Sequence, residues 1–337
     1  MNPLTLNTSR DFHTKVVVGN AHLKTLIQED SLFFLYDESL PKDLLDPLLK
    51  VDNSKKMGLP PKEASKTWES VKRVIDHLES LNITRSTTLC AIGGGALTDV
   101  AAFIASIYLR GLRLYLVPTT LLAMVDAAIG GKTAINGQFK NRIGTFYPAE
   151  KIFIDSDILK TMPETLKTEG MSEIIKIALI KDAEFVTQLE EKSMSDLDVV
   201  KRAIALKIDT VGRDLTDQNE RLLLNFGHTT GHALEALHHY SYSHGACIAA
   251  GMVLDTAQQP FGARIHKLLL DYGCFTPVPF TKDALIPLIK GDKKRWDDHL
   301  ISVELITIGQ AHIKPVPLND FIHQLPTTYP TLENNNE

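Results

Sequence analysis

Residues 87–99 read TTLCAIGGGALTD, a strand-like run that ends in three glycines and leads into a helix-like segment over residues 99–108. Glycines let the backbone approach a phosphate closely, and a helix N-terminus offers N–H groups at the positive end of the helix dipole. The spacing Gly-Gly-Gly-x-x-x-Asp differs from the GxGxxG fingerprint, and a tight strand-to-helix turn would leave the same pattern. The stretch therefore predicts a strand-to-helix turn that suits a diphosphate.

Strand-like and helix-like segments alternate on both sides of this stretch. Short β-rich runs occupy residues 16–18, 32–36, 114–117 and 152–154. Residues 63–81 have helical spacing, which places on one face Trp68, Val71, Val74, Ile75 and Leu78. Strands that alternate with helices indicate a parallel sheet with right-handed crossovers.

The character of the chain changes after about residue 158. Helical patterns then occupy residues 169–180, 198–211 and 225–237, and one strand-like run follows at 301–308. A length of 337 residues also favours two domains. We predict an α/β fold: a Rossmann-like parallel-sheet nucleotide-binding domain over residues 1–157, and a mainly α-helical metal- and substrate-binding domain over residues 158–337.

Composition limits the function classes. The chain is 44% hydrophobic and 23% charged, as in soluble globular proteins, and its formal net charge of −5 argues against a nucleic-acid surface. No apolar run approaches the roughly 20 residues that span a bilayer, and the N-terminus has no apolar signal core. Three widely spaced cysteines favour reduced thiols and a cytoplasmic location. An anionic ligand would need a local cluster of cations.

Two further segments favour a nucleotide at one edge of the sheet. Asp37 follows the strand-like run 32–36, where an acid binds a ribose or adenine edge or simply forms a turn. Thr119 and Thr120 follow the run 114–117, and their hydroxyls could face the same crevice.

Residues 225–232 read NFGHTTGH, in which His228 and His232 lie one helical turn apart. His244 follows twelve residues later, and Glu173 lies in an earlier helix-like segment. Two histidines and one carboxylate make a three-ligand site with open coordination, as in catalytic zinc centres. The chain has twelve histidines, so the pair could arise by chance, and spacing alone does not select the ligands.

Cations lie in the segments next to these motifs: Lys132, Lys140, Lys176, Lys207, Arg221 and Lys293. Each one alone is typical of a solvated surface. Lys176 follows Glu173 by three positions and would share its helix face. If several converge, they would form a pocket for a polyanion despite the acidic net charge.

Taken together, the motifs resemble one family, the 3-dehydroquinate synthases, in order from about residue 30 to about residue 310. The residues that carry the resemblance are Gly93-Gly94-Gly95-x-x-x-Asp99, Arg110-Gly111, Pro118-Thr119-Thr120 to Asp126, Gly130-Gly131-Lys132-Thr133, Lys140-Asn141-x-Ile-Gly144, Gly170-Met-Ser-Glu173-Ile-Ile-Lys176, Asn225-Phe-Gly-His228-Thr-x-Gly-His232 and His244-Gly245. Eight ordered motifs are far more specific than any one of them.

The resemblance implies roles for individual residues. Metal ligands, for zinc or cobalt, would be Glu173, His228 and His244. NAD would contact Asp37, Glu63, Lys66, Gly94, Gly95, Asp99, Thr119, Thr120, Lys140 and Thr161. The substrate phosphate would contact Lys132, Asn141, Lys176 and His232, joined by Arg110 of a neighbouring subunit in a homodimer. Its carboxylate would contact Arg221 and Lys293, and its ring hydroxyls Asp126 and Lys207.

The implied reaction converts a small sugar-acid phosphate, 3-deoxy-arabino-heptulosonate 7-phosphate, into 3-dehydroquinate and phosphate, a step of aromatic amino acid biosynthesis. It would proceed by transient oxidation with NAD, phosphate elimination, re-reduction and intramolecular aldol closure. The metal would act as a Lewis acid that lowers a hydroxyl pKa. Because NAD is regenerated, the enzyme would be a lyase.

Other functions remain open at this stage. Another sugar phosphate cyclase would act on a substrate without a carboxylate, which Arg221 and Lys293 disfavour. A metal-dependent polyol dehydrogenase would not need the phosphate-binding cations. A non-catalytic binding protein is a further alternative, because the sequence departs from the family pattern at several positions. These are Ala246, Leu166, Tyr147-Pro148 and a loop one residue short before Lys140.

Overall fold

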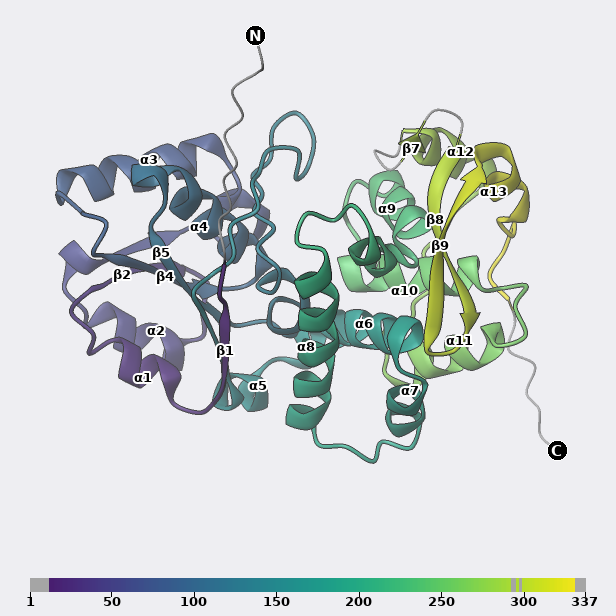
Figure 1. Ribbon diagram of the computed structural model, residues 1–337, viewed down its shortest axis with the longest axis horizontal. Helices are drawn as coiled ribbons and strands as arrows, with labels where there is room; N and C mark the ends of the chain where they lie inside the picture. The colour runs from purple at the N-terminus through teal and green to yellow at the C-terminus, as the bar shows by residue number, and fades with distance from the viewer. Residues whose placement is uncertain (1–11, 292–294, 297–298, 331–337) are drawn as a thin grey trace, which may run out of the picture. The chain divides into compact units, whose positions relative to one another are not determined.

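The computed structural model describes residues 12–291, 295–296 and 299–330 (Figure 1). The chain divides into two compact units. The first contains the described residues up to Pro118 together with Gly131–Asp157, and the second contains Thr119–Gly130 and the described residues from Ile158 onwards. The expected N-terminal domain included residues 119–130. They group with the second unit because the π-helix η4 (Ala123–Ala127) packs against two helices of that unit, α6 (Glu164–Lys181) and α8 (Asp196–Arg213).

The first unit contains a six-stranded parallel sheet in its described residues, in the order β1-β6-β5-β4-β2-β3. The strands are β1 (Lys15–Gly19), β2 (Leu32–Asp37), β3 (Lys56–Leu59), β4 (Thr88–Gly93), β5 (Arg113–Pro118) and β6 (Lys151–Asp155). The helices are α1 (His22–Leu26), α2 (Lys42–Leu49), α3 (Trp68–Ser80) and α4 (Gly95–Ile107), with short 3₁₀ turns η1 (Asn53–Lys55), η2 (Lys62–Ser65) and η3 (Tyr108–Arg110). Helices α3 and α4 cover one face of the sheet, and α1 and α2 cover the other (Figure 1).

Helices cover both faces of the sheet, which explains why its strands are apolar. All six residues of the central strand β4 are buried, which is why its sequence is mostly apolar after Thr88 and does not alternate with polar residues. Helix α3 begins at Trp68 rather than at the expected residue 63, because the Thr67 side chain accepts a hydrogen bond from the Ser70 N–H and caps the helix there. Trp68 was expected on the buried face, but it remains 50% exposed.

The second unit is mainly helical in its described residues. Its helices are α5 (Ser156–Thr161), which begins at the end of the first unit, then α6, α7 (Ala183–Glu190), α8, η5 (Glu220–Asn225), α9 (His228–Leu237), α10 (His244–Asp255), α11 (Gly262–Asp271), α12 (Lys282–Lys290) and α13 (Leu318–Gln324). A small antiparallel sheet joins β7 (Arg295–Trp296), β8 (His299–Thr307) and β9 (Gln310–Pro317). None of the described helices has both the length and the apolar character needed to cross a membrane.

Glycines let three helices of this unit approach one another closely. A Cβ atom built on Gly251 of α10 would lie 2.1 Å from the Gly227 carbonyl oxygen, and one on Gly231 of α9 would lie 2.9 Å from the Cys247 carbonyl oxygen. A Cβ atom on Gly245 would lie 2.6 Å from the carbonyl oxygen of Glu169 in α6. Real Cβ atoms do not approach backbone oxygens so closely, so these positions require glycine. The spacing of α6, α9 and α10 is therefore set by backbone contact.

This packing predicts that Gly251→Ala lowers stability by at least about 1–3 kcal/mol, because the added methyl group must push α9 away from α10. Gly212→Ala in α8 is the matched control, since nothing among the described residues lies within 4 Å of its added Cβ atom. That substitution should be neutral or stabilise the protein by up to about 1 kcal/mol. Thermal unfolding measures both variants, and equal midpoints for the two would contradict the packing argument.

Candidate active site

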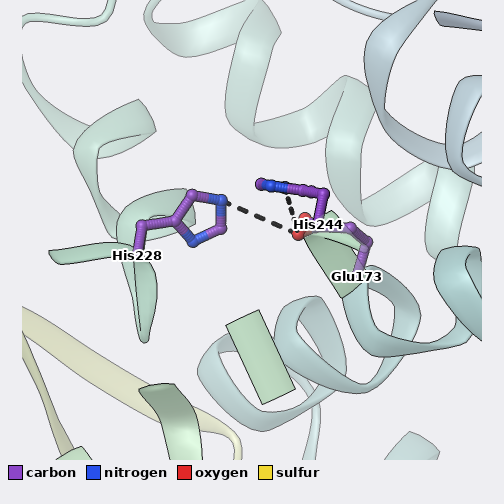
Figure 2. Close-up of side chains that lie close together, drawn as sticks. All are labelled: Glu173, His228 and His244. Carbon is purple, nitrogen blue, oxygen red and sulfur yellow. Dashed lines mark ion pairs between the residues drawn. The ribbon is translucent and has the colours of Figure 1, made fainter. Parts of the chain in front are cut away.

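Three sequence-predicted residues from three helices converge in the second unit (Figure 2). Glu173 comes from α6, His228 begins α9 and His244 begins α10. The Nε2 atom of His228 lies 3.7 Å from Oε1 of Glu173, and Nε2 of His244 lies 3.6 Å from the same oxygen. One ligand atom from each residue lies within 4.8 Å of the others. A carboxylate oxygen and two imidazole nitrogens thus surround one point.

The donor atoms fit a divalent cation. Oε1 of Glu173 is buried and has no hydrogen-bond partner among the described residues, an arrangement that is costly unless another group satisfies it. Ligands at roughly 2.0–2.2 Å from a tetrahedral ion lie roughly 3.3–3.6 Å from one another, close to the observed separations. The Nδ1 atom of His228 is 3.0 Å from the Phe226 carbonyl oxygen, so a proton held there puts the lone pair of the neutral ring on Nε2, the atom nearer Glu173.

Charges around Glu173 keep it ionised. Burial alone would raise its pKa, but the ammonium group of Lys176 and the nearby His244 outweigh burial and lower the pKa below its ordinary value. Lys176 donates to Oε2 of Glu173, and both side chains are 2% exposed. Burial likewise opposes the charged form of His244, but Glu173 and Glu235 raise the pKa of His244 to about 10. A cation that binds here must therefore displace a proton from His244.

His232 lies close to this cluster. Its ring centroid is 5.2 Å from that of His228 and 6.0 Å from that of His244. The side chain is 40% exposed, whereas that of His228 is 12% exposed. His232 and His244 also form a second potential ligand group with Glu235, a residue that was not predicted from the sequence.

Three of the expected substrate cations are buried in the same unit. Lys176, Lys207 and Arg221 are 2%, 5% and 2% exposed. Lys207 donates to Asp126, and burial, partly offset by that carboxylate, lowers the pKa of Lys207. Repulsion by the Lys176 and Arg221 charges also lowers the pKa of Lys207, as expected for neighbouring cations in one cluster. Such a cluster attracts an anion although the whole chain is acidic.

The Arg221 guanidinium is held mainly by backbone. Its Nη1 atom donates to the carbonyl oxygens of Gly130 at 2.8 Å and Leu215 at 2.7 Å. Burial lowers the pKa of Arg221, although the nearby Asp217, Asp126 and Asp214 carboxylates oppose that shift. Its Nε–H is buried without a partner among the described residues, so the group retains a donor for an anionic ligand.

The first unit gathers several of the predicted nucleotide residues. Gly94 is the N-cap of α4, and no described side chain caps that helix, which leaves its first N–H groups available to a phosphate. A Cβ atom on Gly93 would lie 2.5 Å from a side-chain carbon of Leu97 and 3.2 Å from Cβ of Asp37, so glycine lets the turn pack closely against α4 and the end of β2. Lys66 is 2% exposed and donates to Asp99 at 2.7 Å and to the side chain of Asn141.

Other predicted residues are arranged differently. Glu63 accepts from Asn136 and lies 3.5 Å from the amino group of Lys140. Asp37 accepts from the backbone and hydroxyl of Ser39, the ordinary pattern of a turn residue. Arg110 lies between the C-terminal end of α4 and the first residue of β5, at the N-terminal ends of the parallel strands. Gly94 instead follows the C-terminal end of β4.

The remaining predicted residues belong to different units of the chain. Thr119, Thr120 and Thr161 group with the second unit, whereas Gly95 and the exposed Lys132 belong to the first. Lys293 lies outside the described residues. Spacing could have identified Glu235, since it stands three residues after His232 and seven after His228 and therefore shares their helix face.

Comparison with known proteins identifies the family. The domain described as 3-dehydroquinate synthase N-terminal matches residues 56–169, and the C-terminal domain of the same family matches residues 170–295. The 3-dehydroquinate synthase of Pyrococcus furiosus is 34% identical over 310 residues, which cover 89% of this chain and 88% of that protein. The chain belongs to the 3-dehydroquinate synthase family.

Two further comparisons agree with this assignment. The 3-dehydroquinate synthase of Methylacidiphilum infernorum is 41% identical over 242 residues, 69% of this chain and 68% of that protein. A solved 2-epi-5-epi-valiolone synthase from Streptomyces hygroscopicus, with NAD+ and Zn2+ bound, superposes with a TM-score of 0.82 at 25% identity and covers 95% of this chain and 98% of its own. The 3-dehydroquinate synthase family therefore shares this fold with other sugar phosphate cyclases.

The buried Lys176–Glu173 pair predicts a pH-dependent effect of Lys176→Met in the metal-free protein. Removing one partner of a buried pair costs about 3–5 kcal/mol. Because the folded-state pKa of Glu173 is lowered, its contribution to stability is present above its unfolded pKa of about 4.3 and is lost as pH falls through the folded value. The loss of stability should thus be largest near about pH 7 and shrink only as the pH falls below about 4.3 towards the lowered pKa of folded Glu173.

Lys181→Met is the control for this measurement, since Lys181 on the same helix pairs with Glu220 in a more exposed position. Thermal unfolding across the pH range compares the variants. A loss of stability from Lys176→Met that stayed constant with pH would contradict the role of the pair.

Proposed function

We propose that this chain is a 3-dehydroquinate synthase that converts 3-deoxy-arabino-heptulosonate 7-phosphate into 3-dehydroquinate and phosphate. The observation that carries the proposal is the convergence of Glu173, His228 and His244 around an unsatisfied carboxylate oxygen, in a chain of this family. The buried cations of the same unit support a phosphorylated, carboxylate-bearing substrate. The enzyme is a lyase, because the hydride removed from the substrate is returned to it.

Two cofactors belong to this proposal. Glu173, His228 and His244 would hold one divalent ion, zinc or cobalt, which when bound acts as a Lewis acid and lowers the pKa of a coordinated hydroxyl group. NAD would be held by Asp37, Glu63, Lys66, Gly94, Gly95, Asp99, Thr119, Thr120, Lys140 and Thr161. The uncapped N-terminus of α4 supports diphosphate binding at Gly94 and Gly95.

The chain's polar groups would bind and orient the substrate. Its phosphate would contact Lys132, Asn141, Lys176 and His232, its carboxylate Arg221 and Lys293, and its ring hydroxyls Asp126 and Lys207. Lys176, Lys207 and Arg221 are already desolvated and held by neighbouring groups, so they need little reorganisation when charge develops. Fixed donors of this kind typically contribute on the order of 10²–10³ in rate.

The proposal includes a cytoplasmic homodimer in which Arg110 acts on the neighbouring subunit's substrate. Arg110 lies at the opposite end of the parallel strands from Gly94, which supports a role away from the nucleotide-binding turn of its own subunit. A polyol dehydrogenase is disfavoured because its substrate carries no phosphate that would require a buried cluster of three cations. Another sugar phosphate cyclase is disfavoured by Arg221, whose Nε–H has no partner in the described part of the chain and suits a carboxylate.

Direct assay tests the proposal. With metal and NAD present, the heptulosonate phosphate should release phosphate without net accumulation of NADH, because the cofactor is recycled. Net NADH formation with glycerol would instead indicate a dehydrogenase. Phosphate release only from a neutral sugar phosphate would indicate another cyclase, and no turnover of any of these substrates would indicate a binding protein.

The metal assignment predicts different outcomes for two histidines of α9. His228→Ala should lose most of its bound metal together with turnover, because it removes a ligand. His232→Ala should keep the metal but turn over on the order of 10²-fold more slowly, because it removes a phosphate contact. His299→Ala, at an exposed position on β8, is the control. Elemental analysis that finds a full complement of metal in the His228 variant would refute the ligand assignment.

A further inference from the structure

A carboxylate lies directly behind one of the proposed metal ligands. Glu235 is on α9, on the same helix face as His228 and His232, and is 5% exposed. Its Oε1 atom lies 3.0 Å from Nδ1 of His244, and its Oε2 atom lies 3.9 Å from Nε2 of His232. The distance to His244 is that of a hydrogen bond, and the distance to His232 is not.

This contact determines which nitrogen of His244 faces the ligand cluster. An ionised carboxylate only accepts hydrogen bonds, so the Nδ1 atom of His244 must carry a proton to make this contact. In the neutral imidazole, Nε2 then holds a lone pair, and Nε2 is the atom 3.6 Å from Oε1 of Glu173. The Phe226 carbonyl oxygen sets His228 in the same way, through its contact of 3.0 Å with Nδ1.

We propose that Glu235 is a positioning residue that holds His244 in the Nδ1–H tautomer and directs its Nε2 atom to the metal. The inference rests on the proposed function, because it assumes that Glu173, His228 and His244 bind the ion. Carboxylates that orient a metal-bound histidine typically contribute 10–100-fold in metal affinity or activity, and their negative charge strengthens the ligand. Glu235 thus acts through His244 and is not itself a ligand.

The geometry argues against the other possibility, in which His232, Glu235 and His244 bind the ion directly. If that set used Oε1 of Glu235 and Nδ1 of His244, the two ligand atoms would lie only 3.0 Å apart, closer than the roughly 3.3–3.6 Å edge of a tetrahedral site. It would also leave Oε1 of Glu173 buried and unsatisfied. The Glu173 set satisfies that oxygen and keeps the hydrogen bond to Glu235.

Cobalt substitution tests the inference with readouts other than activity. Cobalt(II) affinity is measured by competition with a chelator for the unmodified protein, Glu235→Ala and Glu235→Gln. Thr230→Val is the matched control, because Thr230 is also buried on α9 but bonds to Asp255. Proton NMR of the cobalt proteins then detects the shifted, exchangeable ring N–H signals, one from each coordinated histidine.

Glu235→Ala should bind cobalt(II) about 10–100-fold more weakly, and the His244 N–H signal should shift or vanish through fast exchange. The His228 signal should persist, since the Phe226 carbonyl still accepts from it. Glu235→Gln should lose less affinity, because its amide oxygen can still accept from Nδ1–H. Thr230→Val should match the unmodified protein in both readouts.

The outcomes separate this inference from the proposed function. If the unmodified protein binds cobalt and turns over, but Glu235→Ala keeps its affinity within about twofold and both N–H signals, the positioning role is refuted alone. If Glu173→Gln retains cobalt while Glu235→Gln loses it, Glu235 is a ligand, and both the inference and the ligand assignment are wrong. If the unmodified protein binds no divalent metal, the proposed function itself fails.

Discussion

The second unit is organised around one buried charge, the carboxylate of Glu173. One oxygen accepts from Lys176, and the other faces two imidazole rings with no hydrogen-bond partner among the described residues. A buried carboxylate with one unsatisfied oxygen is costly unless a cation completes its surroundings. The α6, α9 and α10 backbones hold this arrangement because glycines bring them into direct contact. Helix packing therefore holds the carboxylate and the two imidazole rings around one point.

The buried cations show how an acidic protein can select an anionic substrate. Lys207 and Arg221 have lowered pKa values because burial opposes their charge, and nearby carboxylates and carbonyl oxygens partly offset this cost. Each charge is therefore held in a defined position rather than on a mobile surface chain. Because desolvated charges interact strongly, a phosphate and a carboxylate could be recognised together by few groups.

Much of this architecture could be predicted from sequence. Strands β2, β4, β5 and β6 are apolar because they are covered on both faces, and their positions were expected correctly. Strand β3 was missed because it is short and contains Gly58 and Lys56, whose amino group is satisfied by the carbonyl oxygens of Leu49 and Val51. Helix α9 was expected to begin at residue 225, but Gly227 has a φ of 72° and the helix starts at His228.

At the candidate active site, helical spacing paired His228 with His232, whereas the resemblance to the family selected His244 as the second histidine ligand. Glu235 shares the helix face of His228 and His232, but its hydrogen bond to His244 on another helix could not be predicted from spacing.

The segment Thr119–Gly130 has a consequence for how such a protein can be divided. The chain leaves the first unit at Pro118, contributes η4 and Asp126 to the second, and returns at Gly131 before leaving again after Asp157. A single cut near residue 158 would strip the second fragment of a helix that packs against α6 and α8, and of the carboxylate that neutralises Lys207. The two units are consequently not interchangeable modules.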